Sequence, residues 1–272
     1  DNLMTKYPGI AYFKWDCNSP ITNIYSPYLK DQQSHLYIEH VKGLYNVLER
    51  VKAKYPNLPM MLCSGGGARC DYEALKYFTE FWCSDNTDPV ERIYIQWGFS
   101  QFFPAKAMDA HVTSWNKATS VKFRTDVASM CKLGFDIGLK ELTADELAYC
   151  QTAVANWKRL QNAIMDGDQY RLVSPYEGNH MALNYVSKDT NKAVLFAYDI
   201  HPRFQEKLMA VKLQGLDPNK QYKVEEINLM PSVTSKLGSN GKVFSGDYLM
   251  KVGLNVFGLA TTQSHVIEFT AQ

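Results

Sequence analysis

Short apolar runs alternate with segments of helical periodicity up to about residue 170. Runs of apolar and aromatic residues predict five strands, at 10–16, 60–67, 80–86, 107–115 and 130–139. Between them, apolar residues recur at helical spacing over 33–54, and TADE at 143–146 has the form of a helix-capping box. This alternation indicates a parallel sheet flanked by helices.

After residue 175 the apolar pattern changes to period two, which is typical of half-buried strands. Six runs follow it, at 180–187, 192–200, 208–216, 221–229, 247–256 and 264–271. Turn-rich stretches such as KLGSNGK at 236–242 separate some of them. The pattern predicts a C-terminal antiparallel β-sandwich over 175–272, after an α/β portion over 1–174.

Polar residues stand at the C-terminal ends of successive predicted strands, at Asp16, Ser64, Asp85 and His111. In a closed (β/α)₈ TIM-type barrel these ends form one rim, which favours a barrel over an open doubly wound sheet. A complete barrel has eight strands and roughly 250 residues. We therefore expect about strands 4 to 8 of a barrel here, in the C-terminal portion of a longer polypeptide whose N-terminal part completes it.

The composition of the chain restricts the class of binding partner more than it restricts the fold. The 272 residues include 29 Lys and Arg against 28 Asp and Glu, and this balance does not point to nucleic acid or to a membrane surface. No apolar run approaches the roughly 18 residues of a membrane span. The six cysteines form no CxxC pair, so isolated thiols are expected rather than a zinc site. A neutral small molecule is the expected ligand.

Two aspartates at strand ends carry the candidate chemistry, Asp16 in KWDCN and Asp85 in WCSDNTD. On the fourth and sixth strands of a barrel both would face one cavity, as the carboxylate pair of a retaining glycosidase does. Lys14 points to the same side of its strand as Asp16 and favours the ionised form, which suits a nucleophile. Apolar cover from Trp82 and the like charge of Asp88 favour a protonated Asp85, which suits a general acid.

Other interpretations stay open for several of these residues. An aspartate at a strand end is often a helix N-cap, and SDNTD is rich in capping residues. SGGGARC at 64–70 lacks the GK[ST] ending of a P-loop, so it predicts close approach of backbone N–H groups to a ligand. His111 is expected to be a rim histidine rather than a catalytic base. The chain could also be a carbohydrate-binding remnant that no longer uses its carboxylates.

Several stretches together resemble the α-galactosidases of glycoside hydrolase family thirty-six. They are YFKWDCN, the run from CSGGGARCDYEALKYF to WCSDNTDP, AHVTSW, GDQYRL and LQGLDPNKQYKVEEIN, and they extend over nearly the whole chain. The resemblance implies a retaining exo-α-galactosidase that cleaves raffinose- or melibiose-type oligosaccharides through a galactosyl-aspartate, without metal or organic cofactor. The chain departs from the family at Ala68, where glycine is usual, and at Cys70, where phenylalanine is usual.

The resemblance also implies individual functions for residues of the motifs. Asp16 matches the nucleophile, Asp85 the acid/base, Lys14 and Asn18 the residues that bind galactose hydroxyls, and Cys63 and Gly66 those beside the 2-hydroxyl. Family members contribute further sugar-binding groups from an N-terminal part, so this chain alone is expected to be nearly inactive. Assembly into a homo-oligomer is expected by analogy. A raffinose-synthase-like galactosyl transferase and an α-N-acetylgalactosaminidase stay as alternatives, although Cys63 and its glycines leave little room for an acetamido group.

Overall fold

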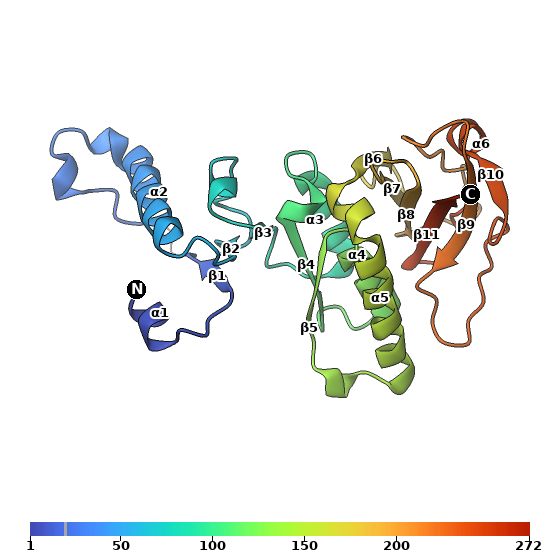
Figure 1. Cartoon of the computed structure of the whole chain (residues 1–272), viewed down its shortest axis with the longest axis horizontal. Helices are drawn as coiled ribbons and strands as arrows, with labels where there is room; N and C mark the ends of the chain where they lie inside the picture. The colour runs from blue at the N-terminus through green and yellow to red at the C-terminus, as the bar shows by residue number, and fades with distance from the viewer. Residues whose placement is uncertain (19–20) are drawn as a thin grey trace. The chain divides into compact units, whose positions relative to one another are not determined.

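The computed structural model describes residues 1–18 and 21–272. It divides into two compact units, Asp1–Asp85 and Asn86–Gln272 (Figure 1). Among the residues described, no helix has the length and apolar character needed to cross a membrane.

The first unit contains three parallel strands. These are β1 (Phe13–Asp16), β2 (Met60–Cys63) and β3 (Glu80–Trp82), with β2 hydrogen-bonded to both of the others. Its helices are α1 (Asn2–Lys6) and α2 (Leu36–Lys54), with 3₁₀ turns η1 (Pro27–Leu29), η2 (Gln33–His35) and η3 (Ala74–Lys76). All residues of β2 and β3 are buried, whereas exposure alternates along β1.

The alternation along β1 explains why a tryptophan separates two charged residues. Lys14 and Asp16 are exposed and Trp15 is half-buried, because neighbouring side chains of a strand point to opposite faces. Trp15 lines a hollow of about 500 Å³ together with Val47 and Val51 of α2. Trp15 therefore faces the hollow beside α2, while the charged pair lies on the other face of the strand.

The second unit begins with the remaining α/β elements. They are α3 (Pro89–Phe99), η4 (Ala105–Ala107), β4 (Met108–Thr113), α4 (Val121–Ala128), β5 (Lys132–Asp136), η5 (Leu139–Glu141) and α5 (Ala144–Asp166). Strands β4 and β5 are parallel. The predicted capping box is confirmed, because Thr143 accepts from the Glu146 backbone and Glu146 accepts from the Thr143 backbone. His111 lies inside β4 rather than at its end, because pairing with β5 continues to Thr113.

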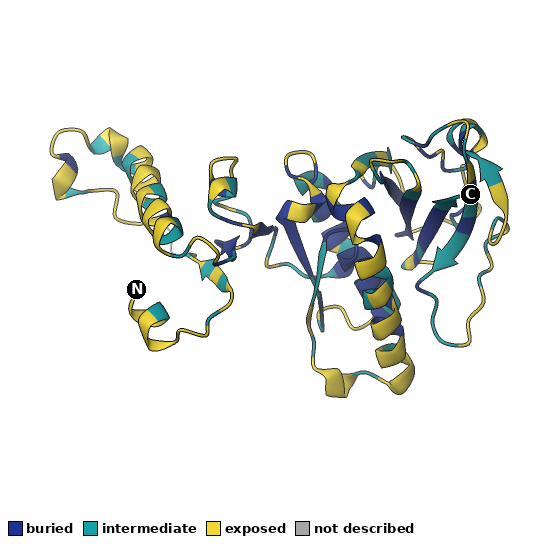
Figure 2. Cartoon of the chain, viewed as in Figure 1, coloured by how far each residue is buried: buried dark blue, intermediate teal, exposed yellow. Residues whose placement is uncertain are grey.

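A six-stranded antiparallel sheet completes the second unit, in the order β10-β9-β11-β8-β7-β6. Its strands are β6 (Asp168–Val173), β7 (His180–Val186), β8 (Lys192–Asp199), β9 (Gln221–Ile227), β10 (Val243–Ser245) and β11 (Gln263–Ala271). Figure 2 shows buried residues along most of its central strands. The fold is thus a parallel α/β portion, part of a barrel, followed by an antiparallel β domain, as the sequence predicts.

The central strands are buried on both faces because the sheet lies between two layers. On one side, the hydroxyls of Tyr185 and Tyr198 donate to the backbone carbonyls of Met130 and Asp126, at 2.8 Å each. On the other side, apolar residues from segments outside the sheet, including Val211 and Leu254, join the core. This packing fixes the β domain against α4 and the turn before β5.

The predictions of two of the six strands expected in this domain, at 208–216 and 247–256, are wrong. Val211 and Leu254 form only an isolated bridge, and α6 (Gly246–Lys251) replaces part of the strand expected at 247–256. Ser245 caps α6 by accepting from the Tyr248 backbone, a local signal that the alternating pattern obscured. Strands β6 and β10 were not expected. Strand β6 precedes the predicted domain border at residue 174, which stays a prediction.

Candidate active site

Asp16 and Cys63 stand side by side at the ends of two neighbouring strands. Asp16 is the last residue of β1 and pairs in register with Cys63, the last residue of β2. The Cys17 backbone N–H donates to the Cys63 carbonyl at 3.1 Å, so the pairing extends one residue further. Asp16 is exposed, whereas Cys63 is 1% exposed. The β1–β2 pairing thus places a solvent-facing carboxylate beside a buried thiol.

Asp85 follows β3 and is held by two donors. Its Oδ1 accepts a hydrogen bond from Trp82 Nε1 at 2.9 Å. The Cys63 thiol donates to the same oxygen, with an Sγ–Oδ1 distance of 3.9 Å. Cys63 therefore adjoins both aspartates, Asp16 through the strand register and Asp85 through its side chain.

Burial and the neighbouring charged groups shift the pKa of the Cys63 thiol. Burial raises the pKa most, and a hydrogen bond with the Gly66 backbone and the positive charge of Lys14 lower it, while the charges of Asp16 and Asp85 raise it. The net direction is upward, so the thiol is protonated at neutral pH and can donate. Two carboxylates and one ammonium group thus act on the same buried atom.

Lys14 lies against the indole that binds Asp85. Its Nζ is 5.1 Å from the centroid of the Trp82 ring, within cation–π range. Trp82 is 5% exposed and packs with Met61 and Cys63 in a small apolar cluster. The indole therefore has a rigid setting between Lys14 and Asp85.

The glycine-rich loop after β2 approaches the β3 end closely. Gly66 has a φ of +83°, and a Cβ there would lie 2.6 Å from Ser84 Cα. Asn18 Oδ1 accepts from the Gly65 backbone at 2.5 Å, and Ser64 Oγ donates to the Cys17 carbonyl at 2.9 Å. The loop is thus fastened to the residues that follow β1, and only glycine fits at position 66.

We expect Gly66→Ala to destabilise the chain by more than about 1 kcal/mol, because alanine is strained at positive φ and its Cβ meets backbone. Urea unfolding would measure the difference. Gly65→Ala is the matched control, since Gly65 has a φ of +57° but a Cβ there meets nothing within 4 Å. Equal costs for the two variants would contradict the close approach to Ser84.

Asp88 and His111 have structural partners of their own. Asp88 is the N-cap of α3, because its carboxylate accepts from the Val90 and Glu91 backbones at 2.8 and 3.3 Å. The capping interpretation of SDNTD therefore applies to its last residue. His111 Nε2 lies 3.3 Å from an oxygen of Asp109.

The two departures from the family pattern fall in the segment between the glycines and β3. Burial, together with the charges of neighbouring groups, raises the pKa of Cys70 to about 12. The next residue, Asp71, accepts from the Ala74 backbone at 2.8 Å and from the Tyr45 hydroxyl. Asp71 therefore ties this segment to α2 through Tyr45.

Sequence reasoning missed one polar contact of this site. It treated Trp82 as apolar cover for Asp85, whereas the indole N–H is a hydrogen-bond donor to that carboxylate. The available signal was the spacing, because a tryptophan three residues before an aspartate can reach it across a turn.

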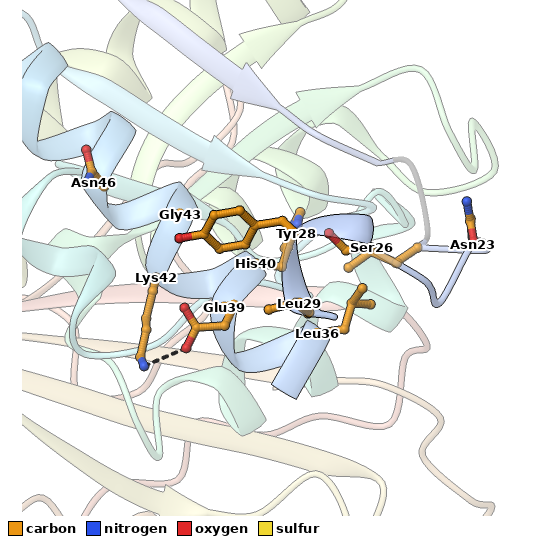
Figure 3. A pocket seen from close by; sticks show the side chains of 11 residues that line it. Asn23, Ser26, Tyr28, Leu29, Leu36, Glu39, His40, Lys42, Gly43 and Asn46 are labelled. Carbon is orange, nitrogen blue, oxygen red and sulfur yellow. Dashed lines mark hydrogen bonds and ion pairs between the residues drawn. The ribbon is translucent and has the colours of Figure 1, made fainter. Parts of the chain in front are cut away.

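A larger hollow lies away from these residues. It has a volume of about 570 Å³ and is bounded by α2 and by residues 21–29 (Figure 3). Lys42 and Glu39 form an ion pair of 2.8 Å at its edge. No predicted site residue lines it. Over residues 1–18 and 21–272, no group of three or more His, Cys, Asp or Glu side chains is placed to hold a metal ion, and all six cysteines are free.

Two family profiles match the chain. The profile named Melibiase matches residues 1–167, and that of the glycosyl hydrolase family 36 C-terminal domain matches residues 180–269. The α-galactosidase AgaA of Geobacillus stearothermophilus is 33% identical over 259 residues, 93% of this chain and 34% of AgaA. α-Galactosidase 1 of Pediococcus pentosaceus is 34% identical over 93% of this chain and 33% of its own length. The chain thus spans about a third of the length of these relatives.

Solved structures show the same fold. Crystal structures of AgaA variants are similar to the whole chain, with a TM-score of 0.84 and 28% identity for one in complex with raffinose, and 0.85 and 30% for one in complex with stachyose. The chain covers 37% of each of these structures.

Proposed function

Because the chain belongs to the α-galactosidases of glycoside hydrolase family 36, we propose that it carries both catalytic carboxylates of a retaining exo-α-galactosidase. The observation that best supports this is the position of Cys63. Its thiol lies 3.9 Å from Asp85, and its backbone pairs in register with Asp16. Two aspartates from separate strand ends thus share one neighbour, and a single hexose needs both within reach.

In the proposed first step, the Asp16 carboxylate bonds to the anomeric carbon of galactose while the bond to the leaving oxygen breaks. Asp85 gives its proton to that oxygen, and a galactosyl ester of Asp16 remains. In the second step, Asp85 takes a proton from water as the water oxygen bonds to the same carbon and Asp16 departs. Two inversions give overall retention.

The remaining residues of the site would orient the sugar. Lys14 and Asn18 are exposed beside Asp16 and carry donors for galactose hydroxyls. Cys63 and Gly66 would lie along the 2-hydroxyl. Cys63 and the glycines that follow it would leave little room there for an acetamido group, which favours galactose over a sugar that carries one. Raffinose- and melibiose-type oligosaccharides are the proposed substrates, because AgaA variants bind raffinose and stachyose.

The assay should use two formats, because the chain spans about a third of its relatives. One is the chain alone, and the other is a chimera in which it replaces the matching segment of AgaA. We expect the chimera to release nitrophenol from p-nitrophenyl α-galactoside, with little or no release by the chain alone. Failure of the chimera, with wild-type AgaA active and the chimera folded, would contradict the proposal and favour a non-catalytic carbohydrate-binding function.

In the active format, Asp85→Asn should slow raffinose hydrolysis by about 10²- to 10⁴-fold, because the leaving fructosyl-glucose oxygen needs a proton. The loss on p-nitrophenyl α-galactoside should be much smaller, since nitrophenolate leaves without one. Asp31→Asn, at an exposed aspartate in a turn, is the control and should leave both rates unchanged. Equal losses on the two substrates would count against Asp85 as the acid.

A further inference from the structure

The two oxygens of Asp85 have different surroundings. Trp82 Nε1 and the Cys63 thiol both donate to Oδ1, at 2.9 and 3.9 Å. Both of these side-chain donors therefore act on the same oxygen. Asp85 itself is exposed, whereas Trp82 and Cys63 are 5% and 1% exposed. The donors therefore reach Asp85 from the buried side.

A carboxylate oxygen has two lone pairs, and an indole N–H can only donate. Because the Trp82 N–H donates to Oδ1 and the Cys63 thiol lies on the same oxygen, a proton on Asp85 is favoured on Oδ2. We propose that Trp82 is a positioning residue that keeps the transferable proton on Oδ2 of Asp85, facing the leaving oxygen. This rests on the acid/base function proposed above for Asp85.

The same contact serves the second half of the reaction. When Asp85 is ionised and must accept a proton from water, the indole N–H stabilises its charge and Oδ2 stays available as the base. Lys14 strengthens this arrangement, because a cation 5.1 Å from the ring centroid polarises the indole N–H toward its acceptor. Trp82 thus couples a residue proposed to bind the sugar to the residue proposed to move the proton.

The setting of Trp82 suits a positioning function. The ring packs against Met61 and Cys63, and Trp82 itself is the last residue of β3. Its donor atom is therefore held by the sheet, while Asp85 lies in the loop that follows. An exposed carboxylate in a loop is thereby tied to a donor on the sheet, which reduces the number of orientations it can adopt.

Trp82→Phe keeps an aromatic ring and removes the N–H. In whichever format is active, we expect raffinose hydrolysis to fall by about 10- to 100-fold, the scale of one hydrogen bond to a charged group. Hydrolysis of p-nitrophenyl α-galactoside should fall by much less, because it needs little proton donation. The ratio of the two losses is the readout, since simple loss of folded protein would lower both rates equally.

Trp157→Phe is a matched control. Trp157 Nε1 donates to the Cys131 carbonyl at 3.0 Å, so this variant loses a bond of similar length from a tryptophan on α5. It should lower the thermal midpoint without changing the ratio between the two substrates. An unchanged ratio in Trp82→Phe, or an equal change in Trp157→Phe, would overturn the proposal.

A second measurement does not depend on activity. The chain has five tryptophans, so its indole ¹H–¹⁵N spectrum has few signals, and the one lost in Trp82→Phe identifies Trp82. We expect this signal to move as pH is raised through the ionisation of Asp85, and to lose that response in Asp85→Asn. A signal that behaves identically in both proteins would overturn the Trp82–Asp85 pairing. An inactive chimera with a responsive indole would overturn the proposed function while supporting the pairing.

Discussion

In the active chimera, Asp16→Gly should abolish hydrolysis of p-nitrophenyl α-galactoside, with a loss of roughly 10⁴-fold or more, because the proposed mechanism forms its covalent intermediate on Asp16. Azide, small enough to enter the space left by the carboxylate, should restore turnover. It would attack the anomeric carbon from the side where Asp16 stands, so the product is β-galactosyl azide. Nuclear magnetic resonance of the product distinguishes its two anomers.

Azide also distinguishes the functions proposed for the two aspartates. In Asp85→Gly, the proposed galactosyl ester of Asp16 should still form from the activated substrate, and azide should then displace Asp16 to give α-galactosyl azide. Asp31→Gly, at an exposed aspartate in a turn, should keep normal hydrolysis and form neither azide through rescue. If Asp16→Gly gave the α-azide, or Asp85→Gly the β-azide, the assignment of the two functions would be reversed.

Asp126→Ala should produce the largest loss of stability among the substitutions considered. Asp126 is fully buried, and its carboxylate accepts from Lys122 at 2.5 Å, Ser264 at 2.7 Å, Tyr149 at 2.8 Å and Asn228 at 3.0 Å. Removing the carboxylate leaves these donors without their acceptor, which lowers the free energy of unfolding by about 3–5 kcal/mol. For a domain of this size the thermal midpoint should fall by roughly 10 °C.

Circular dichroism during heating and urea unfolding would measure this loss. Asp166→Ala is the control, because Asp166 pairs with Lys106 at 2.9 Å but both side chains are more than half exposed. Such a surface pair contributes at most about 1 kcal/mol. A cost for Asp126→Ala no larger than for Asp166→Ala would contradict the view that Asp126 joins the β domain to α4 and α5.

Local patterns predicted most of the secondary structure. The five strands of the α/β portion occur where the apolar runs placed them, and the capping box at Thr143 begins α5. The failures at 208–216 and 247–256 have a common cause. Leu213 and Leu249 lie in segments outside the sheet but are buried in the core of the β domain. The apolar residues of each segment therefore follow a spacing that resembles that of a strand. Burial alone does not require backbone pairing.

The sequence by itself determined which residues stand at the strand ends, because side-chain alternation and helix caps depend only on near neighbours. Asp16 and Asp85 could be chosen on that basis, and their functions stay predictions. The tertiary structure decided what surrounds them. The Cys63 carbonyl accepts from the Cys17 thiol, 46 residues earlier in the chain, because β1 and β2 pair. The Cys63 thiol donates to Asp85, 22 residues later, because the turn after β3 brings that aspartate to it. The donation from Trp82 depends on the turn geometry, and the donors around Asp126 on the packing of distant elements. The spacing of Trp82 and Asp85 permits the first contact without fixing it, and no local pattern encodes the donors around Asp126, because contacts between distant elements arise only once those elements are assembled.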